Sequence, residues 1–266
     1  MTKLIAVDVD GTLLNSQHKI LDQTKISLIK AMEEGHKIVI VSGRPTEAII
    51  SIAEELDLKK YGGLISSYNG GAISNLKTGE KITNHTLDLA LTKEILRKSK
   101  DFDAFPLITN ENTMISDKDN AFLTVESQIL NLEPVIVEDL SDTINFSPNK
   151  IIFTNYPQKL DELIPFLEEN FLDRTSQIRS LRAFYEVMPK GLSKGKSLLE
   201  IAKYYNIDQK DIIAFGDAPN DISMFEIAGS PIAMANADEI IKEMASYITL
   251  SNDENGIGDY LDKFVL

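Results

Sequence analysis

Hydrophobic residues near the N-terminus follow two alternating patterns. Continuous apolar runs of strand length are separated by segments in which the apolar residues recur at helical spacing. The runs are Leu4–Val9, Lys37–Val41 and Leu64–Tyr68, and helices are expected over Asp22–Glu34 and Thr46–Leu58. Because strands that alternate with helices form βαβ units, this part of the chain predicts a parallel sheet.

The first of these expected helices also indicates which of its faces is buried. Ile26, Ile29 and Met32 recur three residues apart, so we predict that they face the core. Gly35 then ends the helix, since glycine readily adopts the left-handed conformation found at helix C-termini.

The pattern changes between Ala72 and Pro189, where short strands and helices mix without regular alternation. We expect a turn at Lys77–Glu80, a strand at Ile151–Thr154, and helices at Asp88–Lys100 and Gln158–Asn170. After Pro189 the alternation resumes, with helices at Ser193–Tyr205 and Asn220–Ala228 and strands at Ile212–Phe215 and Pro231–Ala235. The sequence therefore predicts a discontinuous α/β core of residues 1–82 and 190–266, with an inserted α+β domain of residues 83–189.

The composition of the 266 residues is that of a globular protein, with 43% hydrophobic and 26% charged residues. The formal net charge of −14 repels polyanions, which disfavours nucleic acid and anionic membranes as partners. The absence of cysteine excludes thiolate catalysis and cysteine-based zinc sites. The apolar run before Asp8 is too short for a signal peptide or a membrane span, so we expect a cytoplasmic location.

Two carboxylates, Asp8 and Asp10, stand at the C-terminal end of the first predicted strand. Open α/β sheets bind their ligands at this edge. Residues two apart on a strand point to the same side, so both carboxylates can face one site. Taken alone, the segment could equally be an acidic turn that uses Gly11 and Thr12.

Groups suited to binding anions follow later in the chain. Ser42, Gly43 and Arg44 come directly after the second strand and offer a hydroxyl, a backbone N–H and a guanidinium group. Taken alone, they could form a turn with a solvated arginine. Lys194 begins the helix after the insertion, where it could hold an anion or be a solvated lysine of the first helical turn.

Asp217 and Asp221 follow another apolar strand. Asn220 could be only the N-cap of the next helix, but capping does not explain Asp217. Two carboxylates this close repel each other unless a cation relieves the repulsion. Together with Asp8 and Asp10, they form an oxygen-rich set at one sheet edge that suits Mg²⁺ and favours phosphoryl chemistry.

These segments, in this order, resemble the four motifs of the haloacid dehalogenase (HAD) superfamily. The matching segments are Asp8–Leu14, Ser42–Pro45, Ser193–Gly195 and Gly216–Asp221, while Ala233–Ala237 and Ser251–Gly256 resemble the closing pattern of the Cof-type sugar phosphatase branch. The resemblance covers nearly the whole chain. It implies a Rossmann-like core with a parallel sheet and a C2-type α+β cap inserted at residues 83–189.

The resemblance also implies an activity and roles for two residues. It implies a Mg²⁺-dependent phosphatase that hydrolyses a small phosphorylated metabolite, such as a sugar phosphate. Asp8 would attack phosphorus and form an aspartyl-phosphate intermediate. Asp10 would protonate the leaving alcohol and later activate water.

The same resemblance implies which residues bind the metal and the phosphate. The metal ligands would be Asp8, Asp10, Asp217 and Asp221, the last binding either directly or through water. The phosphate would be held by Ser42, Gly43, Lys194 and Asn220. Arg44 would contact the substrate or the cap.

Two other functions stay open at this point. A phosphohexomutase would return the phosphoryl group from Asp8 to another hydroxyl group. A regulator that had lost turnover would bind a phosphosugar without hydrolysing it. In each case we expect a small-molecule ligand, no nucleic-acid or membrane partner, and a monomer or a small homo-oligomer.

Overall fold

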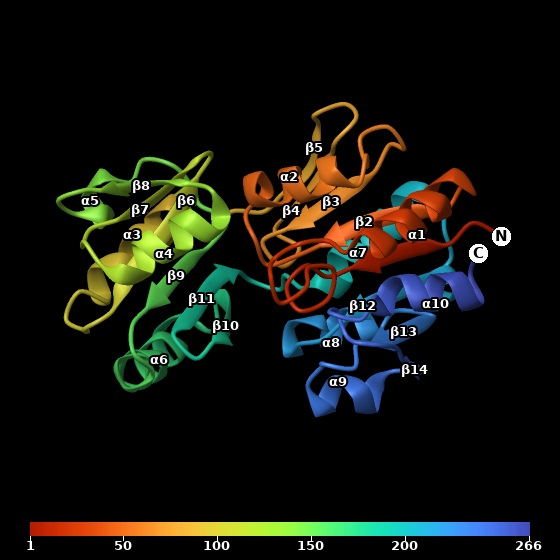
Figure 1. Cartoon of the computed structure of the whole chain (residues 1–266). Coiled ribbons are helices and arrows are strands. Elements are labelled where there is room, and N and C mark those ends of the chain that lie inside the picture. Colours follow the sequence, from red (N-terminus) through yellow and green to blue (C-terminus); the bar gives the residue numbers. More distant parts are fainter. The chain divides into compact units, whose positions relative to one another are not determined.

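The computed structural model describes residues 1–266 and divides into two compact units. The core unit comprises Met1–Thr83 and Ser193–Leu266, and the inserted unit comprises Asn84–Leu192 (Figure 1). Every residue expected to bind the metal or the phosphate lies in the core unit. The predicted site residues therefore all belong to one compact unit.

The core unit is built on an eight-stranded sheet with the order β14-β13-β12-β1-β2-β3-β4-β5. The strands from β14 to β3 in this order are parallel, and β4 runs antiparallel to β3. Their bounds are β1 (Leu4–Val7), β2 (Lys37–Val41), β3 (Leu64–Ser67), β4 (Ala72–Asn75), β5 (Lys81–Asn84), β12 (Ile212–Gly216), β13 (Ser230–Ala233) and β14 (Tyr247–Ile248). The predicted α/β fold with a parallel sheet is confirmed.

Helices cover both faces of this sheet. One hydrophobic cluster joins the strands to α1, α2 and α10, and a second cluster joins them to α7, α8 and α9. The bounds are α1 (Asp22–Glu33), α2 (Thr46–Glu55), α7 (Lys194–Tyr205), α8 (Ile222–Phe225), α9 (Glu239–Met244) and α10 (Gly256–Phe264). The central strands are thus buried on both sides, as parallel sheets require.

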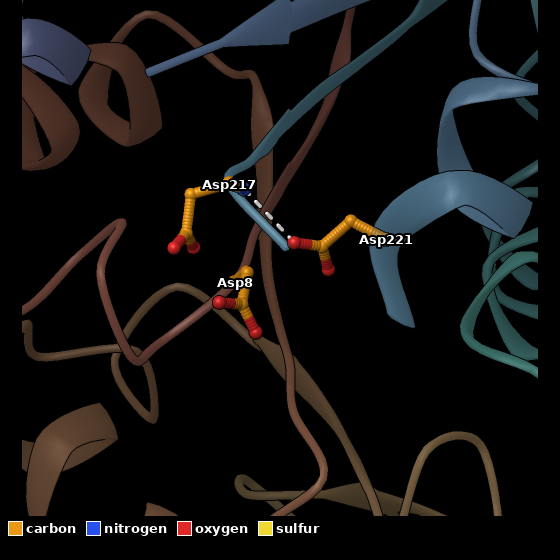
Figure 2. A group of neighbouring side chains, drawn as sticks. All are labelled: Asp8, Asp217 and Asp221. Carbon is orange, nitrogen blue, oxygen red and sulfur yellow. Dashed lines mark hydrogen bonds between the residues drawn. The ribbon is translucent and has the colours of Figure 1, made fainter. Parts of the chain in front are cut away.

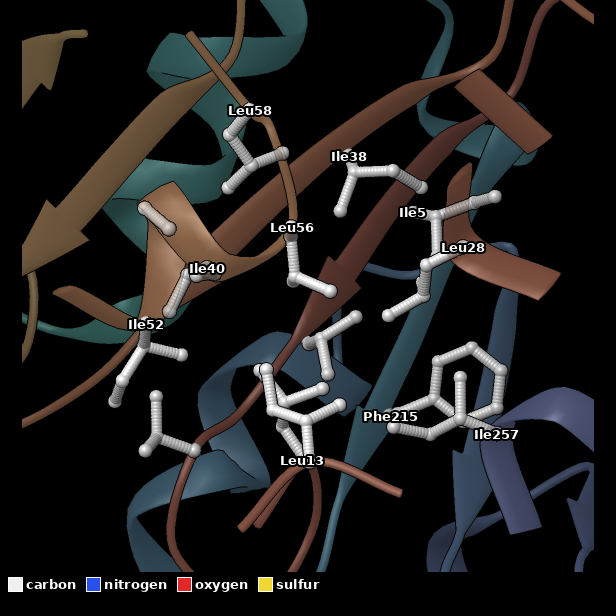
Figure 3. Packing of buried hydrophobic residues seen from close by; sticks show 14 of the residues in the cluster. Ile5, Leu13, Leu28, Ile38, Ile40, Ile52, Leu56, Leu58, Phe215 and Ile257 are labelled. Carbon is white, nitrogen blue, oxygen red and sulfur yellow. The ribbon is translucent and has the colours of Figure 1, made fainter. Parts of the chain in front are cut away.

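Strand β1 shows how its residues supply both clusters. Ile5 and Val7 belong to the cluster under α1 and α10, whereas Leu4 and Ala6 belong to the other. Successive side chains of a strand point to opposite faces, so an unbroken apolar run fills both layers. Figure 3 shows the first cluster, in which Ile5 packs among side chains from neighbouring strands and helices. This packing holds rigid the strand that ends just before Asp8.

The inserted unit contains a six-stranded sheet with the order β10-β11-β9-β6-β7-β8 and its own hydrophobic cluster. All neighbouring strands are antiparallel except β7 and β8. The strands are β6 (Phe105–Asn110), β7 (Thr113–Ser116), β8 (Glu133–Ile136), β9 (Ile151–Thr154), β10 (Thr175–Leu181) and β11 (Phe184–Pro189), and the helices are α3 (Leu89–Lys98), α4 (Ala121–Leu130), α5 (Leu140–Thr143) and α6 (Pro157–Phe171). Across both units, none of the helices combines the length and the apolar character needed to cross a membrane.

The buried face of helix α1 differs in part from the one predicted. Met32 is buried and Ile29 packs against the same cluster, as predicted, but Ile26 does not. Ile26 is 57% exposed, whereas Thr24 and Ser27 are buried. The hydroxyl of Thr24 donates to Asn255 Oδ1 over 2.8 Å, and that of Ser27 donates to Asp262 Oδ1 over 3.0 Å. The prediction that Ile26 faces the core was wrong. Asn255 at the start of α10 and Asp262 within it accept these hydrogen bonds, so burial of the Thr24 and Ser27 hydroxyls is favourable.

The segment expected to be a helix over residues 220–228 is also different. A 3₁₀ turn at Pro219–Asp221 precedes the short helix α8. The capping position of the turn is Ala218, and that of α8 is Asp221. The interpretation of Asn220 as a helix N-cap was therefore wrong.

Candidate active site

Loops at the carboxyl ends of three neighbouring strands bring the candidate residues together. Strand β1 lies between β12 and β2, and all three are parallel. The loop after β1 carries Asp8 and Asp10, the loop after β2 begins with Ser42, and the loop after β12 begins with Asp217. The sheet topology therefore explains why segments more than 200 positions apart meet at one edge.

Three carboxylates form an acidic centre at this edge. One ligand atom from each of Asp8, Asp217 and Asp221 lies within 4.8 Å of the others. Figure 2 shows Asp217 and Asp221 on the segment that passes beside Asp8. Asp8 is 4% exposed and Asp221 is fully buried. Asp217 is half-buried, and three carboxylates this close repel one another unless positive charge lies nearby.

Lys194 supplies one such charge from the first turn of α7. Its Nζ donates to Asp8 Oδ1 over 2.5 Å and to Asp221 Oδ1 over 2.7 Å. The lysine side chain has no solvent-exposed surface. The alternative of a solvated first-turn lysine was therefore wrong: Lys194 is a buried counter-charge shared by two carboxylates.

Close packing of α7 on α8 brings Lys194 to this depth. The backbone N–H of Gly195 donates to Ser223 Oγ over 3.0 Å. A Cβ atom at Gly195 would lie 2.0 Å from the carbonyl oxygen of Ser223, so only glycine permits this approach. Ser193 caps the N-terminus of α7, because its side chain accepts a hydrogen bond from the Lys196 N–H.

Further hydrogen bonds orient Asp217 and Asp221. The backbone N–H groups of Asp217 and Ala218 donate to Asp221 Oδ2 over 3.0 and 3.2 Å. Since Lys194 occupies Oδ1, both oxygens of Asp221 are engaged. The hydroxyl of Thr12 donates to Asp217 Oδ1 over 2.8 Å. Thr12 was missed as a site residue, and its place in the Asp8–Leu14 motif is the signal that could have identified it.

Two glycines make room for these carboxylates. A Cβ atom at Gly11, whose φ is +77°, would lie 2.3 Å from Asp217 Oδ2. A Cβ atom at Gly216 would lie 2.7 Å from the side chain of Asp221. Each glycine is thus required by the side chain that packs against it, and Gly11 also by its backbone conformation.

Burial is the largest single influence on the pKa values of Asp8, Asp217 and Lys194. Burial raises the pKa of Asp8 well above its usual value, and the neighbouring Asp221 raises it further while Lys194 lowers it. Burial also raises the pKa of Asp217 to about 6, against the hydrogen bond from Thr12. Burial opposes the charge on Lys194, but its two carboxylate partners outweigh burial and raise its pKa. One ammonium group thus leaves the three carboxylates only partly neutralised.

Asp10 lies at the rim and outside the acidic centre. Arg44 Nε and Nη2 donate to Asp10 Oδ2 and Oδ1 over 2.9 and 2.6 Å. The Asp10 side chain is 55% exposed, whereas that of Arg44 is 12% exposed. The arrangement is bidentate, so it orients the Asp10 carboxylate toward Arg44.

The remaining predicted phosphate ligands surround this centre. Ser42 is buried, and its Oγ accepts a hydrogen bond from the Arg44 N–H over 3.1 Å. Gly43 packs so closely on Asn69 that a Cβ atom there would lie 3.1 Å from Asn69 Oδ1. Asn220 is half-buried in the 3₁₀ turn after β12. These residues occupy the loops beside the acidic centre, on the same sheet edge.

Residues 5–261 match the family model of the haloacid dehalogenase-like hydrolases. The chain belongs to this family. A protein of Streptococcus pyogenes is 33% identical to this chain over 267 residues, and its name provisionally describes it as a phosphatase. The alignment covers 99% of this chain and 98% of the Streptococcus protein. The similarity therefore spans both units of this hydrolase.

Solved structures agree with this assignment. A haloacid dehalogenase-like hydrolase from Bacteroides thetaiotaomicron is 30% identical, with a TM-score of 0.94 and 99% of each chain covered. The HAD subclass IIB sugar phosphatase BT4131 is 26% identical, with a TM-score of 0.83 and again 99% of each chain covered. The predicted relation to the Cof-type branch of the HAD superfamily is confirmed.

The acidic centre of this hydrolase fits a hard divalent cation. Its donors are carboxylate oxygens only, which suit Mg²⁺ and not soft metals. Burial, the main cause of the raised pKa values of Asp8 and Asp217, disfavours their ionised forms, and a bound cation would favour those forms. Both oxygens of Asp221 accept hydrogen bonds, whereas Asp8 and Asp217 each accept one through Oδ1.

Proposed function

We propose that this hydrolase is a Mg²⁺-dependent phosphatase that hydrolyses a small phosphorylated metabolite through an aspartyl-phosphate on Asp8. The observation that carries the proposal is the buried contact of Lys194 with Asp8 and Asp221, beside Asp217. A binding protein gains nothing from an acid/base aspartate, Asp10, two positions from the nucleophile position at Asp8. Family membership and full-length similarity to proteins named phosphatases support the same enzyme class.

Asp8 is the proposed nucleophile. Lys194 holds Asp8 Oδ1, so the other carboxylate oxygen is the one that attacks phosphorus. The new bond forms as the bond from phosphorus to the leaving alcohol oxygen breaks, in line with the attack. A bound Mg²⁺ would neutralise the repulsion between the anionic carboxylate and the anionic phosphate. Water then attacks the aspartyl-phosphate, which releases inorganic phosphate and restores Asp8.

Asp10 is the proposed general acid and base. It is sufficiently exposed to reach a substrate oxygen, and it follows the nucleophile by two positions. In the first step it gives a proton to the leaving alcohol, and in the second it takes one from the attacking water. Its bidentate pair with Arg44 occupies both carboxylate oxygens, so this contact must open before Asp10 can reach the leaving oxygen.

The proposed phosphate-binding groups lie around the acidic centre. Ser42, the Gly43 backbone and Asn220 are proposed to hold the phosphoryl oxygens with Lys194, stabilising charge that spreads over them in the transition state. Arg44 is proposed to contact the substrate. With a formal net charge of −14, the protein needs such local donors to attract an anionic substrate at all.

A sugar phosphate is the proposed substrate class. The similarity to the sugar phosphatase BT4131 along the whole chain supports this choice. We further propose that the inserted unit is a cap that selects among phosphorylated metabolites. A hydrolysis screen over phosphorylated sugars, nucleotides and cofactors would identify the preferred substrate.

The mechanism is tested by phosphate release from the best substrate of that screen. We expect activity with Mg²⁺, loss of activity with EDTA, and no activity in Asp8→Asn. Undiminished release by Asp8→Asn would refute the mechanism. Net inorganic phosphate as the product favours hydrolysis, whereas an isomeric phosphosugar would identify a mutase instead. Tight binding of the sugar phosphate without turnover over hours would identify a regulator.

A further inference from the structure

Two asparagines far along the chain hold the loop that follows β1. Asn236 Nδ2 donates to the carbonyl oxygen of Gly11 over 2.8 Å. Asn252 Nδ2 donates to the carbonyl oxygen of Leu14 over 2.8 Å. The two asparagines are themselves connected, because the Asn252 N–H donates to Asn236 Oδ1 over 3.1 Å. Three hydrogen bonds thus form one continuous chain across this loop.

Two amides of the loop form hydrogen bonds within it and do not reach the carbonyls of Gly11 and Leu14. The N–H groups of Leu13 and Leu14 donate to the carbonyls of Asp8 and Val9 over 3.1 and 2.9 Å. These bonds close the loop on itself, while the carbonyls of Gly11 and Leu14 point outward to the side-chain amides described above. A backbone carbonyl that lacks a hydrogen-bond partner destabilises the folded loop. The two asparagines supply the partners that the carbonyls of Gly11 and Leu14 need.

The position of Gly11 makes the first of these contacts important for catalysis. Gly11 directly follows Asp10 and has a φ of +77°, so the backbone here has more freedom than at other residue types. The carboxylate of Asp10 has Arg44 as a bidentate partner, but it is 55% exposed and little packing restrains it. A general acid must stay within about 2.6–3.2 Å of the atom that it protonates.

We propose that Asn236 is a positioning residue, which fixes the backbone beside Asp10 through the Gly11 carbonyl and is itself oriented by Asn252. The inference rests on the proposed phosphatase function. Asn236 is exposed, so its side chain adds little to the buried core, and its main effect is on the geometry of the loop. A misplacement of about 1 Å in such a group can reduce the rate by about a hundredfold.

Two substitutions separate the lost hydrogen bond from other effects. Asn236→Asp keeps the shape and the acceptor for the Asn252 N–H, but it cannot donate to Gly11 and it adds a charge. Asn236→Ala removes both hydrogen bonds without adding charge. Equal losses of rate in the two variants would assign the effect to the contact with Gly11.

Steady-state kinetics provides the first measurement. We expect kcat to fall about tenfold to hundredfold in both variants. KM should change by less than about twofold, because the proposed phosphate contacts of Ser42 and Lys194 come from the loop after β2 and from helix α7. Wild-type turnover together with an inactive Asp8→Asn would show that the proposed function holds. Unchanged kcat in both Asn236 variants would then overturn this inference alone.

Hydrogen exchange provides a second measurement that needs no activity. In Asn236→Ala and Asn252→Ala, amides of residues 8–16 should exchange at least about threefold faster than in the wild type. Amides of β2, which has its own neighbours in the sheet, should keep their rates. Unchanged exchange in residues 8–16 would show that the asparagines do not restrain the loop, whatever the enzyme hydrolyses.

Discussion

Lys194 Nζ lies 2.5 Å from Asp8 Oδ1, and neither side chain is open to solvent beyond 6% of its surface. The same ammonium group contacts Asp221, so one buried cation serves two buried carboxylates. Removing one partner of a buried ion pair leaves an uncompensated charge, which is more costly than losing a surface contact. The relationship therefore bears on stability as well as on chemistry.

The first prediction concerns Lys194→Met. Without the ammonium group of Lys194, the buried carboxylates of Asp8 and Asp221 repel each other. We therefore expect the free energy of unfolding of the metal-free protein to fall by about 3 kcal/mol. Phosphate release should fall by at least about a hundredfold. Urea unfolding and a phosphate assay measure the two effects. Lys203→Met, an exposed position in the last turn of the same helix, is the control and should change neither.

The second prediction concerns pH and Mg²⁺. The pKa of Asp217 is raised from 3.8 to about 6. Its contribution to the free energy of unfolding is therefore full below about pH 4 and is lost as the pH rises through about 6. Metal-free protein should thus become less stable across this window. Mg²⁺ requires the ionised carboxylate, so its stabilising effect should be larger at pH 7.5 than at pH 5.

Thermal unfolding with EDTA or Mg²⁺ at the two pH values tests this linkage. Asp217→Asn removes one titrating group and should weaken both dependences, while the raised pKa of Asp8 keeps part of them. An equal rise in Tm on adding Mg²⁺ at both pH values would contradict the assignment of Asp217 as a metal ligand.

The third prediction compares two glycines with similar backbone conformations. Gly11 and Gly79 have φ values of +77° and +73°. A Cβ atom at Gly11 would lie 2.3 Å from Asp217 Oδ2, whereas one at Gly79 would meet nothing within 4 Å. Both alanine variants should lose about 1 kcal/mol from backbone strain. Only Gly11→Ala should also lose activity and Mg²⁺ affinity, which calorimetric titration would measure.

The fourth prediction tests which face of α1 is buried. Leu28 has no exposed surface, so Leu28→Ala should destabilise the protein by about 3 kcal/mol. Ile26 is 57% exposed, and Ile26→Ala should stay within about 0.5 kcal/mol of the wild type. Denaturant unfolding of the two variants measures both effects. A larger loss from Ile26→Ala than from Leu28→Ala would contradict the described packing.

Much of the architecture could be predicted from local patterns in the sequence. Apolar runs such as Lys37–Val41 are visible without knowledge of the fold, and their alternation with helices indicates a parallel sheet. Parallel strands share one carboxyl edge, so the residues that follow them, including Asp8 and Asp217, could be assigned to the same edge. Hydrophobic periodicity carries this information because it depends only on neighbouring residues.

The polar contacts of the site could not be predicted in the same way. The burial of Lys194, the pair of Arg44 with Asp10 and the bond from Thr12 to Asp217 all join separate segments of the chain. A lysine in a first helical turn looks the same in sequence whether it is solvated or buried. The partners that decide between these states are supplied by packing between α7 and the strand ends.

What the sequence by itself determined is therefore the class of fold, the sheet edge that carries the site and the types of group gathered there. The tertiary structure decided which groups are buried, which are paired and which face of α1 meets the core. The physical reason is that a buried polar group is tolerated only where a partner satisfies it, and that partner can lie anywhere in the sequence. Lys194 and Asp8, both buried and 186 positions apart, are the clearest example.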